Sequence, residues 1–524
     1  MATETYETLN KAWKTTAKVI LGEEIGDLEG YSKWLWQHME PFSVKKSAVS
    51  RKDVYLAVPY YCQDAKFISL EEIDFGKKFE PLNINEVKDI DSIAQALQER
   101  FVYTGNIILA NSKNVARSTN IQNSFHVYHS NFVFDSEYVA YSSYTRYSKY
   151  IFSVNNDDES NFLIKGFDSF MQARCLETWG CYSSSDCYYC SRVEGSQNAL
   201  FSFNLRNRHN IIGNRELEKS KFAQLKAKLV QEIRDELKRK KLLPSLMELV
   251  AGQKKALTKE KIETSEGRGP EDKRPIEEAF VKTTKVLLGK ELQDMDKYEK
   301  WLMRHVPGVE TVKSVATGKP TYFVLITPYN VLPRDRLVKE NECKRLGELL
   351  SLEQQDIESF DSIKKTLWKI AFFTSEATVG DTRNIIDIPL VNQSLNCYKG
   401  ALFSYDEYAG FSFWPRNSKY VFGCDLAFSS QFCIHAYYSL NLSRAFEVDS
   451  CSNSSDIYFS HNCENVHESM FCFNEKNLRH AIGNAPLEIG KYRSIKQALL
   501  AQISDTLEKK KELKLDVYNI GCGD

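Results

Sequence analysis

Polar residues that recur at matching positions in the two halves of this sequence are the first candidates for chemistry. The set comprises Arg174, Glu177 and Asp186 in one half and Arg444, Glu447 and Asp456 in the other. An arginine and an acid present twice could line a groove for a charged ligand or protein partner, because both groups form charge-assisted hydrogen bonds. The structural alternative is that they pair with neighbouring strands or satisfy turn amides. In one extended strand, Arg174 and Glu177 would point to opposite faces.

Cysteines form the second candidate group. The chain has 13, and an odd number without an apolar signal segment predicts reduced thiols and not a disulfide framework. The candidates for metal ligands are Cys181, Cys187, Cys190 and Cys451. Cys187 and Cys190 have the spacing of a metal or redox pair, but the second half has Ile457 and Ser460 at those positions. A strand would also point the two thiols to opposite faces, so we predict small buried side chains and no metal.

Enzyme signatures are missing from the sequence. It contains no GxxxxGK[ST], HExxH or GxSxG motif, and no GxGxxG after an expected strand. His38 and His305 are the only histidines that correspond between the halves, and each ends an apolar helical stripe. These observations predict no catalytic residues and a protein that is not an enzyme.

The tract SEYVAYSSYTRYSKYIF at 136–152 interleaves tyrosine with arginine and lysine. Such a tract could stack on and neutralise single-stranded nucleic acid. Tyrosine and serine are also ordinary residues of surface strands, and the second half has fewer charges there. Nucleic acid is therefore an alternative partner.

Charge and hydropathy limit the class of protein. Lys and Arg number 69 against 70 Asp and Glu, so no global field drives nucleic-acid or membrane binding. The N-terminal segment is polar, and no apolar run approaches the length of a membrane span. The expectation is a cytoplasmic protein without a membrane partner.

The elements that must position these residues occur twice. KTTAKVILGEEIGDLEGYSKWLWQHMEP at 14–41 returns as KTTKVLLGKELQDMDKYEKWLMRHVPG at 282–308, and from Asp91 onward the offset is 270 residues. We predict an α+β fold built by tandem duplication. Each copy begins with a helical and strand subdomain and ends with an amphipathic helix that closes the strand region.

Short apolar clusters recur every 12 to 13 residues between those parts. In the first half they centre near Val139, Ile151, Leu163 and Cys175, separated by Asn, Ser, Asp and Gly. Regular short strands without helices between them, and without Asn-Gly or Asp-Gly hairpin signals, favour a β-solenoid over an antiparallel sandwich. We expect it to resemble a right-handed β-helix, with Asn and Ser at its corners.

The expected boundaries follow from the repeat. The first unit is 1–250, with a helical cap at 1–104, a solenoid at 105–214 and a closing helix at 215–250. The second unit is 275–524, with the corresponding parts at 275–374, 375–484 and 485–515. The segment 251–274 is predicted to be a flexible linker, because it is rich in charge, Gly and Pro and lacks apolar periodicity.

The ends of the two strand regions, LRNRHNIIGNRELEKSKFAQLKAKL and NEKNLRHAIGNAPLEIGKYRSIKQAL, carry a family resemblance. They resemble the end of a family of uncharacterised Asn-, Cys- and aromatic-rich repeat proteins of archaea and candidate bacteria, which are similar to the β-helical core of Suf-type (SufB/SufD-like) iron–sulfur assembly scaffolds. The matching residues are Leu205, Arg206, Asn207 and Asn214, then Asn477 and Asn484. The resemblance implies a β-helix and a role in cluster assembly. The CxxC series of the family is largely replaced here by Tyr, Phe and Ser.

Together these features predict a non-catalytic scaffold or protein-interaction protein, with a protein partner or self-assembly. An iron–sulfur or metal assembly factor is the first alternative, with an iron–sulfur cluster as its cofactor; otherwise no cofactor is expected. An RNA- or ribosome-associated factor is the second alternative.

Overall fold

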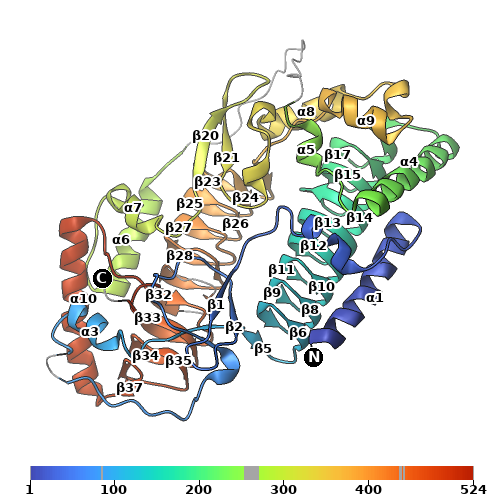
Figure 1. Cartoon of the computed structure of the whole chain (residues 1–524). Coiled ribbons are helices and arrows are strands. Elements are labelled where there is room, and N and C mark those ends of the chain that lie inside the picture. The colour runs from blue at the N-terminus through green and yellow to red at the C-terminus, as the bar shows by residue number, and fades with distance from the viewer. Residues whose placement is uncertain (1, 84–85, 253–270, 436–438, 441–442, 523–524) are drawn as a thin grey trace. The chain divides into compact units, whose positions relative to one another are not determined.

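The chain is a mixed α/β protein in which most neighbouring strands pair in parallel (Figure 1). The computed structural model describes all residues except 1, 84–85, 253–270, 436–438, 441–442 and 523–524. Most of the predicted linker at 251–274 lies outside the described residues. No described helix is both long enough and apolar enough to span a membrane.

The chain packs into two compact units, and each combines parts of both sequence halves. Unit 1 consists of Met1–Ser43, Asn106–Ser265 and Glu310–Glu376, and unit 2 of Val44–Gly105, Glu266–Val309 and Ala377–Asp524. We call 310–376 and 44–105 the exchanged segments, because each joins the unit built mainly from the other half. Sequence periodicity indicates which elements form but not which neighbours they pack against. The boundaries expected from the repeat therefore did not predict that these segments join the other unit.

Unit 1 is organised around one long series of strands. Its helices are α1 (Ala2–Leu21), α2 (Ser32–Leu35), α4 (Lys219–Lys240), α5 (Leu246–Val250), α8 (Glu340–Leu349) and α9 (Phe360–Thr366). Its strands are β5 (Ile108–Leu109), β6 (Lys113–Ala116), β7 (Thr119–Gln122), β8 (Phe125–Tyr128), β9 (Asn131–Phe134), β10 (Glu137–Ala140), β11 (Ser143–Arg146), β12 (Lys149–Asp158), β13 (Asn161–Phe170), β14 (Ala173–Trp179), β15 (Ser185–Glu194), β16 (Gln197–Leu200), β17 (Phe203–Arg206), β18 (His209–Ile212), β19 (Arg215–Glu216) and β21 (Pro320–Val324), with β20 (Val309–Lys313) beside β21.

Unit 2 has the same kind of organisation. Its helices are α3 (Ile90–Leu97), α6 (Arg274–Leu288), α7 (Glu299–Leu302) and α10 (Ile489–Lys510). Its strands are β1 (Ser43–Lys46), β2 (Asp53–Leu56), β3 (Phe67–Ser69), β4 (Tyr103–Gly105), β22 (Ala377–Val379), β23 (Arg383–Ile386), β24 (Leu390–Asn392), β25 (Leu395–Ala401), β26 (Phe403–Ser404), β27 (Glu407–Phe413), β28 (Lys419–Phe422), β29 (Ala427–Phe428), β30 (Gln431–Ile434), β31 (Ser439–Leu440), β32 (Ser443–Asp449), β33 (Ser455–Glu464), β34 (His467–Met470), β35 (Phe473–Lys476), β36 (Ala481–Ile482) and β37 (Ala485–Pro486).

Paired strands are shifted by 12 residues in both units. Glu137 pairs with Lys149, which pairs with Asn161. In unit 2, Glu407 pairs with Lys419 in the same way. The Lys149 and Lys419 side chains also form ion pairs with these glutamates, at 3.3 and 2.8 Å. The spacing predicted from the apolar clusters is therefore confirmed, with 12 as the repeating step.

A residue in the left-handed φ region occurs at every third position of the strand series, without interruption from Asn114 to Glu177. Each of these residues turns the chain, so two side chains three positions apart can both point into the interior of the strand series. Cys187 and Cys190, which flank Tyr189 at φ 54°, are both fully buried in one interior cluster. Our expectation of opposite faces was wrong for this reason.

Interior serines connect successive strands in unit 1. The amide N–H groups of Ser136, Ser148 and Ser160 each donate to the Oγ atom of the serine 12 residues earlier, at 2.9 to 3.1 Å. Each of these hydroxyls also donates to the carbonyl two residues before it. Serine was expected at corners and in ladders; these serines form a ladder, and they lie inside because the hydroxyl satisfies a buried amide. Asparagine does occupy corners, as at Asn207 and Asn214.

One asparagine ends each strand series. The Asn214 side chain accepts the amide of Phe203 at 2.8 Å and donates to its carbonyl at 3.1 Å. Asn484 makes the same two contacts with Phe473, at 2.8 and 2.7 Å. Each side chain thus replaces the backbone of a next strand, and α4 or α10 begins shortly after it.

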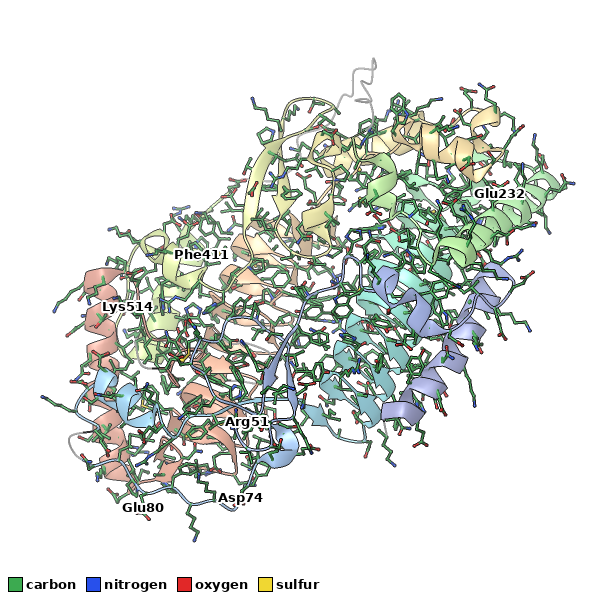
Figure 2. All side chains as sticks on the ribbon, in the orientation of Figure 1. Arg51, Asp74, Glu80, Glu232, Phe411 and Lys514 are labelled. Atoms are coloured by element: carbon green, nitrogen blue, oxygen red, sulfur yellow. A yellow bond between two sulfur atoms is a disulfide. The ribbon has the colours of Figure 1, made fainter. Side chains whose placement is uncertain are left out.

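The exchanged segment of unit 1 covers the last strands of that unit, where α8 and α9 lie near β17 (Figure 1). Asn204 donates to the carbonyl of Phe372 at 3.0 Å, and the Leu352 amide donates to Gly213 at 2.8 Å. Glu232 on α4, labelled in Figure 2, accepts the amide of Phe360 at 2.7 Å. These contacts fix 310–376 to the end of the strand series.

The exchanged segment of unit 2 makes corresponding contacts. Asn474 donates to the carbonyl of Val102 at 2.8 Å, and the Thr104 amide donates to His461 Nε2 at 2.8 Å. The His461 Nδ1 atom is 2.5 Å from Asp449, and both side chains are buried. Strand β4 therefore lies against β33 and β35.

Two cysteines depart from the predicted redox state. Cys62 and Cys522 form a disulfide across a sequence separation of 460, whereas the other eleven cysteines are free and buried. The expectation of reduced thiols was wrong for this pair, because spacing along the chain does not show that segment 44–105 packs beside the C-terminal residues.

Candidate functional site

Arg174 and Asp186 form an ion pair in unit 1. The guanidinium donates twice to the carboxylate, at 3.2 and 2.7 Å, from strands that are neighbours in the sheet. Lys226 of α4 lies 3.6 Å from the same carboxylate and donates to Asn198 at 2.8 Å. Burial acts to raise the pKa of Asp186, but Arg174 and Lys226 outweigh it and lower that pKa. The Asp186 carboxylate thus pairs with both cations of this group.

The corresponding group in unit 2 is open. Arg444, Asp456 and Lys496 line a pocket of about 600 Å³ between the end of α6, one face of α10 and strands β32 to β34. Burial raises the pKa of Asp456 despite the nearby charges of Lys496 and Arg444. Burial also lowers the pKa of Lys496, whose ammonium lies 4.8 Å from the Tyr458 ring centre.

The glutamates predicted beside these arginines do not line a groove. Glu177 is 1% exposed, and its Oε2 lies 4.0 Å from the Nζ of Lys165, which is also buried. Its Oε1 accepts the Leu246 amide at 2.8 Å and the Trp179 indole N–H at 3.0 Å. Desolvation raises the pKa of Glu177 although Lys165 opposes the shift. The contacts support the structural alternative for this residue.

Glu447 is equally buried in unit 2. Its Oε1 lies 3.9 Å from His435 Nε2, the residue that takes the place of Lys165. Burial raises the pKa of Glu447 well above its usual value and lowers that of His435 well below it. Both groups are therefore favoured in their neutral forms.

The candidate cysteines lie in the strand interiors. Cys181, Cys187 and Cys190 belong to the interior cluster of unit 1, and Cys451 belongs to that of unit 2. Burial raises the pKa of the Cys181 thiol to about 12. Across the residues that the structure describes, no three His, Cys, Asp or Glu side chains are grouped to share a metal ion.

The tyrosine-rich tract forms part of a corner column. Tyr138 stacks on His126 and on Tyr150, with ring centres 5.1 and 4.8 Å apart. Tyr147 is 61% exposed, whereas Tyr141 is buried. The rings of the column already stack on one another, so the tract contributes to the fold.

Three residues of the open pocket were missed by sequence reasoning. Tyr492 and Lys496 come from α10 and Glu468 from β34. Lys496 matches Lys226 at the offset of 270, so an alignment of the two closing helices identifies Lys496 as a shared residue. Tyr492 replaces Phe222, and Glu468 replaces Asn198. The two halves therefore differ at Tyr492 and Glu468 around this pocket.

Comparisons with protein-family models, curated protein sequences and solved structures find no match to this chain.

Proposed function

We propose that this protein is a non-catalytic scaffold, built from two β-solenoid units, that assembles with a protein partner or with itself. The observation that supports this most is the 12-residue register joined by interior serine ladders. Such a register spreads hydrogen bonds and ion pairs along a rigid strand series. The polar candidates Arg174 and Asp186 are used in those strand-to-strand contacts.

We also propose that the two units arose by duplication. Supporting contacts recur at matched positions. Lys241 and Lys511 each follow a closing helix, and each donates to a tyrosine hydroxyl, Tyr31 at 3.0 Å and Tyr298 at 3.1 Å. The backbone contacts of Asn214 and Asn484 are a second such pair.

Native mass spectrometry of the protein purified from its own host tests the scaffold proposal. We expect a stoichiometric complex with another protein or an oligomer of this chain, because a scaffold acts by presenting a surface. A monomer without any partner, in gently lysed cells and after cross-linking, would contradict the proposal.

The same experiment separates the alternatives. Bound iron and sulfide in anaerobically purified protein would favour an iron–sulfur assembly factor, and copurifying RNA that is lost as salt is raised would favour an RNA-associated factor. A cytoplasmic location remains a proposal. Disulfides are rare in cytosolic proteins, so alkylation of Cys62 and Cys522 in intact cells tests it.

A further inference from the structure

The open pocket of unit 2 has two cationic groups, Arg444 and Lys496, that its own carboxylates do not hold in an ion pair among the described side chains. Lys290 is held by Asp505 at 3.0 Å, and Glu468 by His480 at 2.8 Å. Among the described side chains, no ion pair engages Arg444 or Lys496. The carboxylates of Asp456 and Glu468 act on Lys496 through their charge, but neither is within ion-pair distance of it.

A buried phenol adds a hydrogen-bonding group to the pocket. Tyr492 is 0% exposed, and its hydroxyl finds no hydrogen-bond partner within the described part of the chain. Phe222 occupies the matching place in unit 1. A buried hydroxyl without a partner is costly, so its presence where phenylalanine fits indicates a ligand that accepts its proton.

The remaining wall of the pocket is apolar. Val286, Leu287 and Leu500 line it beside the polar groups. A pocket of about 600 Å³ has the size of small-molecule sites, which combine an apolar wall with a few placed polar groups.

We propose that this pocket binds a small organic oxyanion, a carboxylate or a phosphate monoester, through Arg444, Lys496 and Tyr492. The oxyanion accepts from the guanidinium, the ammonium and the phenol, and its organic part lies against Leu500. Arginine suits this role because its planar fork matches the geometry of carboxylate and phosphate oxygens. The ligand also supplies a direct ion-pair partner for Lys496, whose pKa is lowered by burial although Asp456 and Glu468 oppose the shift.

In unit 1 the corresponding groups pair with one another. There Asp186 occupies both Arg174 and Lys226, and Asn198 stands where unit 2 has Glu468. The proposal is therefore specific to unit 2, and Arg174 provides a matched control.

Isothermal titration of the full chain with phenyl phosphate and with phenylacetate tests the proposal, with benzyl alcohol as the uncharged control. We expect at least one of the two anions to bind with a millimolar or lower dissociation constant and benzyl alcohol to bind more weakly. The anion that binds identifies the head group. Saturation by neither anion, or equal binding of benzyl alcohol, would overturn the proposal.

Variants locate the site. Arg444→Gln should weaken binding of the anion about tenfold or more, because a charge-assisted hydrogen bond is lost. Arg174→Gln should bind as the unmodified protein does. Equal effects of the two substitutions, or no effect of Arg444→Gln, would contradict the assignment.

Tyr492→Phe keeps the test decisive if Arg444→Gln does not fold. Phenylalanine is accommodated at the matching position of unit 1, so this variant should fold, as circular dichroism will show. We expect its anion affinity to fall several-fold. Unchanged affinity would show that the Tyr492 phenol does not contact the ligand and would overturn the proposal.

Discussion

Two carboxylates, those of Asp406 and Asp157, are buried in the strand interior. Asp406 takes the place of a ladder serine between Ser394 and Ser418. It accepts the amide N–H groups of Ser418 at 2.9 Å and Ser404 at 2.8 Å. Burial raises its pKa to about 8 in spite of these hydrogen bonds. Asp157 in unit 1 is similar, with a pKa of about 7 caused chiefly by burial.

Replacing Asp406 with serine should flatten the dependence of stability on pH. Because its pKa is raised on folding, the folded state binds more protons than the unfolded state between about pH 4 and about pH 8. The free energy of unfolding therefore falls as pH rises through this window, by an amount on the order of a few kcal/mol per carboxylate. Urea unfolding at several pH values measures it.

The unmodified protein and the variant are compared by the slope of the free energy of unfolding against pH. Asp406→Ser should lose less stability than the unmodified protein on going from acidic to neutral pH, while Asp157 still contributes in both. A variant whose stability falls as steeply as that of the unmodified protein would show that Asp406 is already ionised in the folded state.

At the scale of elements, paired strands repeat in steps of 12 residues, with a left-handed residue at every third position from Asn114 to Glu177. Non-glycine residues in that region cost about 1–2 kcal/mol each, so the arrangement persists only because interior packing and strand hydrogen bonds offset the cost. Asparagine is favoured at such positions, which accounts for Asn207 and Asn214. If the strand series is the proposed solenoid, one 12-residue repeat should be removable without a change of register.

Deleting residues 137–148 removes one whole turn and should leave a folded protein. Lys149 would then follow Ser136 in the same register, because Glu137 pairs with both Phe125 and Lys149. Deleting only 137–142 shifts the register by half a turn and should abolish folding. Thermal unfolding followed by circular dichroism compares the two. Equal stability of both deletions would contradict the solenoid proposal.

The repeating step was predictable from the sequence, but the orientation within it was not. Clusters at Leu163 and Cys175 showed the period, and these residues do pair. The prediction that Cys187 and Cys190 point to opposite faces was wrong. Alternation of side chains requires an extended strand, and Tyr189 at φ 54° interrupts the extended conformation. The pocket was not predicted from the sequence, because Tyr492 and Lys496 come from a helix that is distant in sequence from Arg444.

At the scale of the whole molecule, exchange of segments makes each sequence half incomplete. Residues 310–376 cover the end of unit 1, where Cys343 Sγ contacts Asn204 at 2.9 Å, and residues 44–105 do the same in unit 2. Neither half includes every segment of either compact unit. Folding of one half is thus coupled to the presence of the other.

Separate expression of 1–265 and 266–524 tests this coupling. Each fragment alone should be unstable, because it exposes strand ends that the other fragment covers. Coexpressed fragments should copurify through a tag on one of them and regain the circular dichroism spectrum of the full chain. A single fragment that unfolds cooperatively and remains monodisperse on its own would contradict the coupling.

The Cys62–Cys522 disulfide gives the molecule a covalent topology that its linear sequence does not convey. The polypeptide between these cysteines, which are 460 positions apart, is a closed ring. Opening any one peptide bond of that ring leaves a single molecule until the disulfide is reduced. In the chain-entropy account, closing a loop of this length lowers the entropy of the unfolded ensemble and so raises the free energy of unfolding by about 6 kcal/mol. From Cys62 to Cys522 the order of elements is accordingly cyclic, and new chain ends within the ring would preserve every other connection.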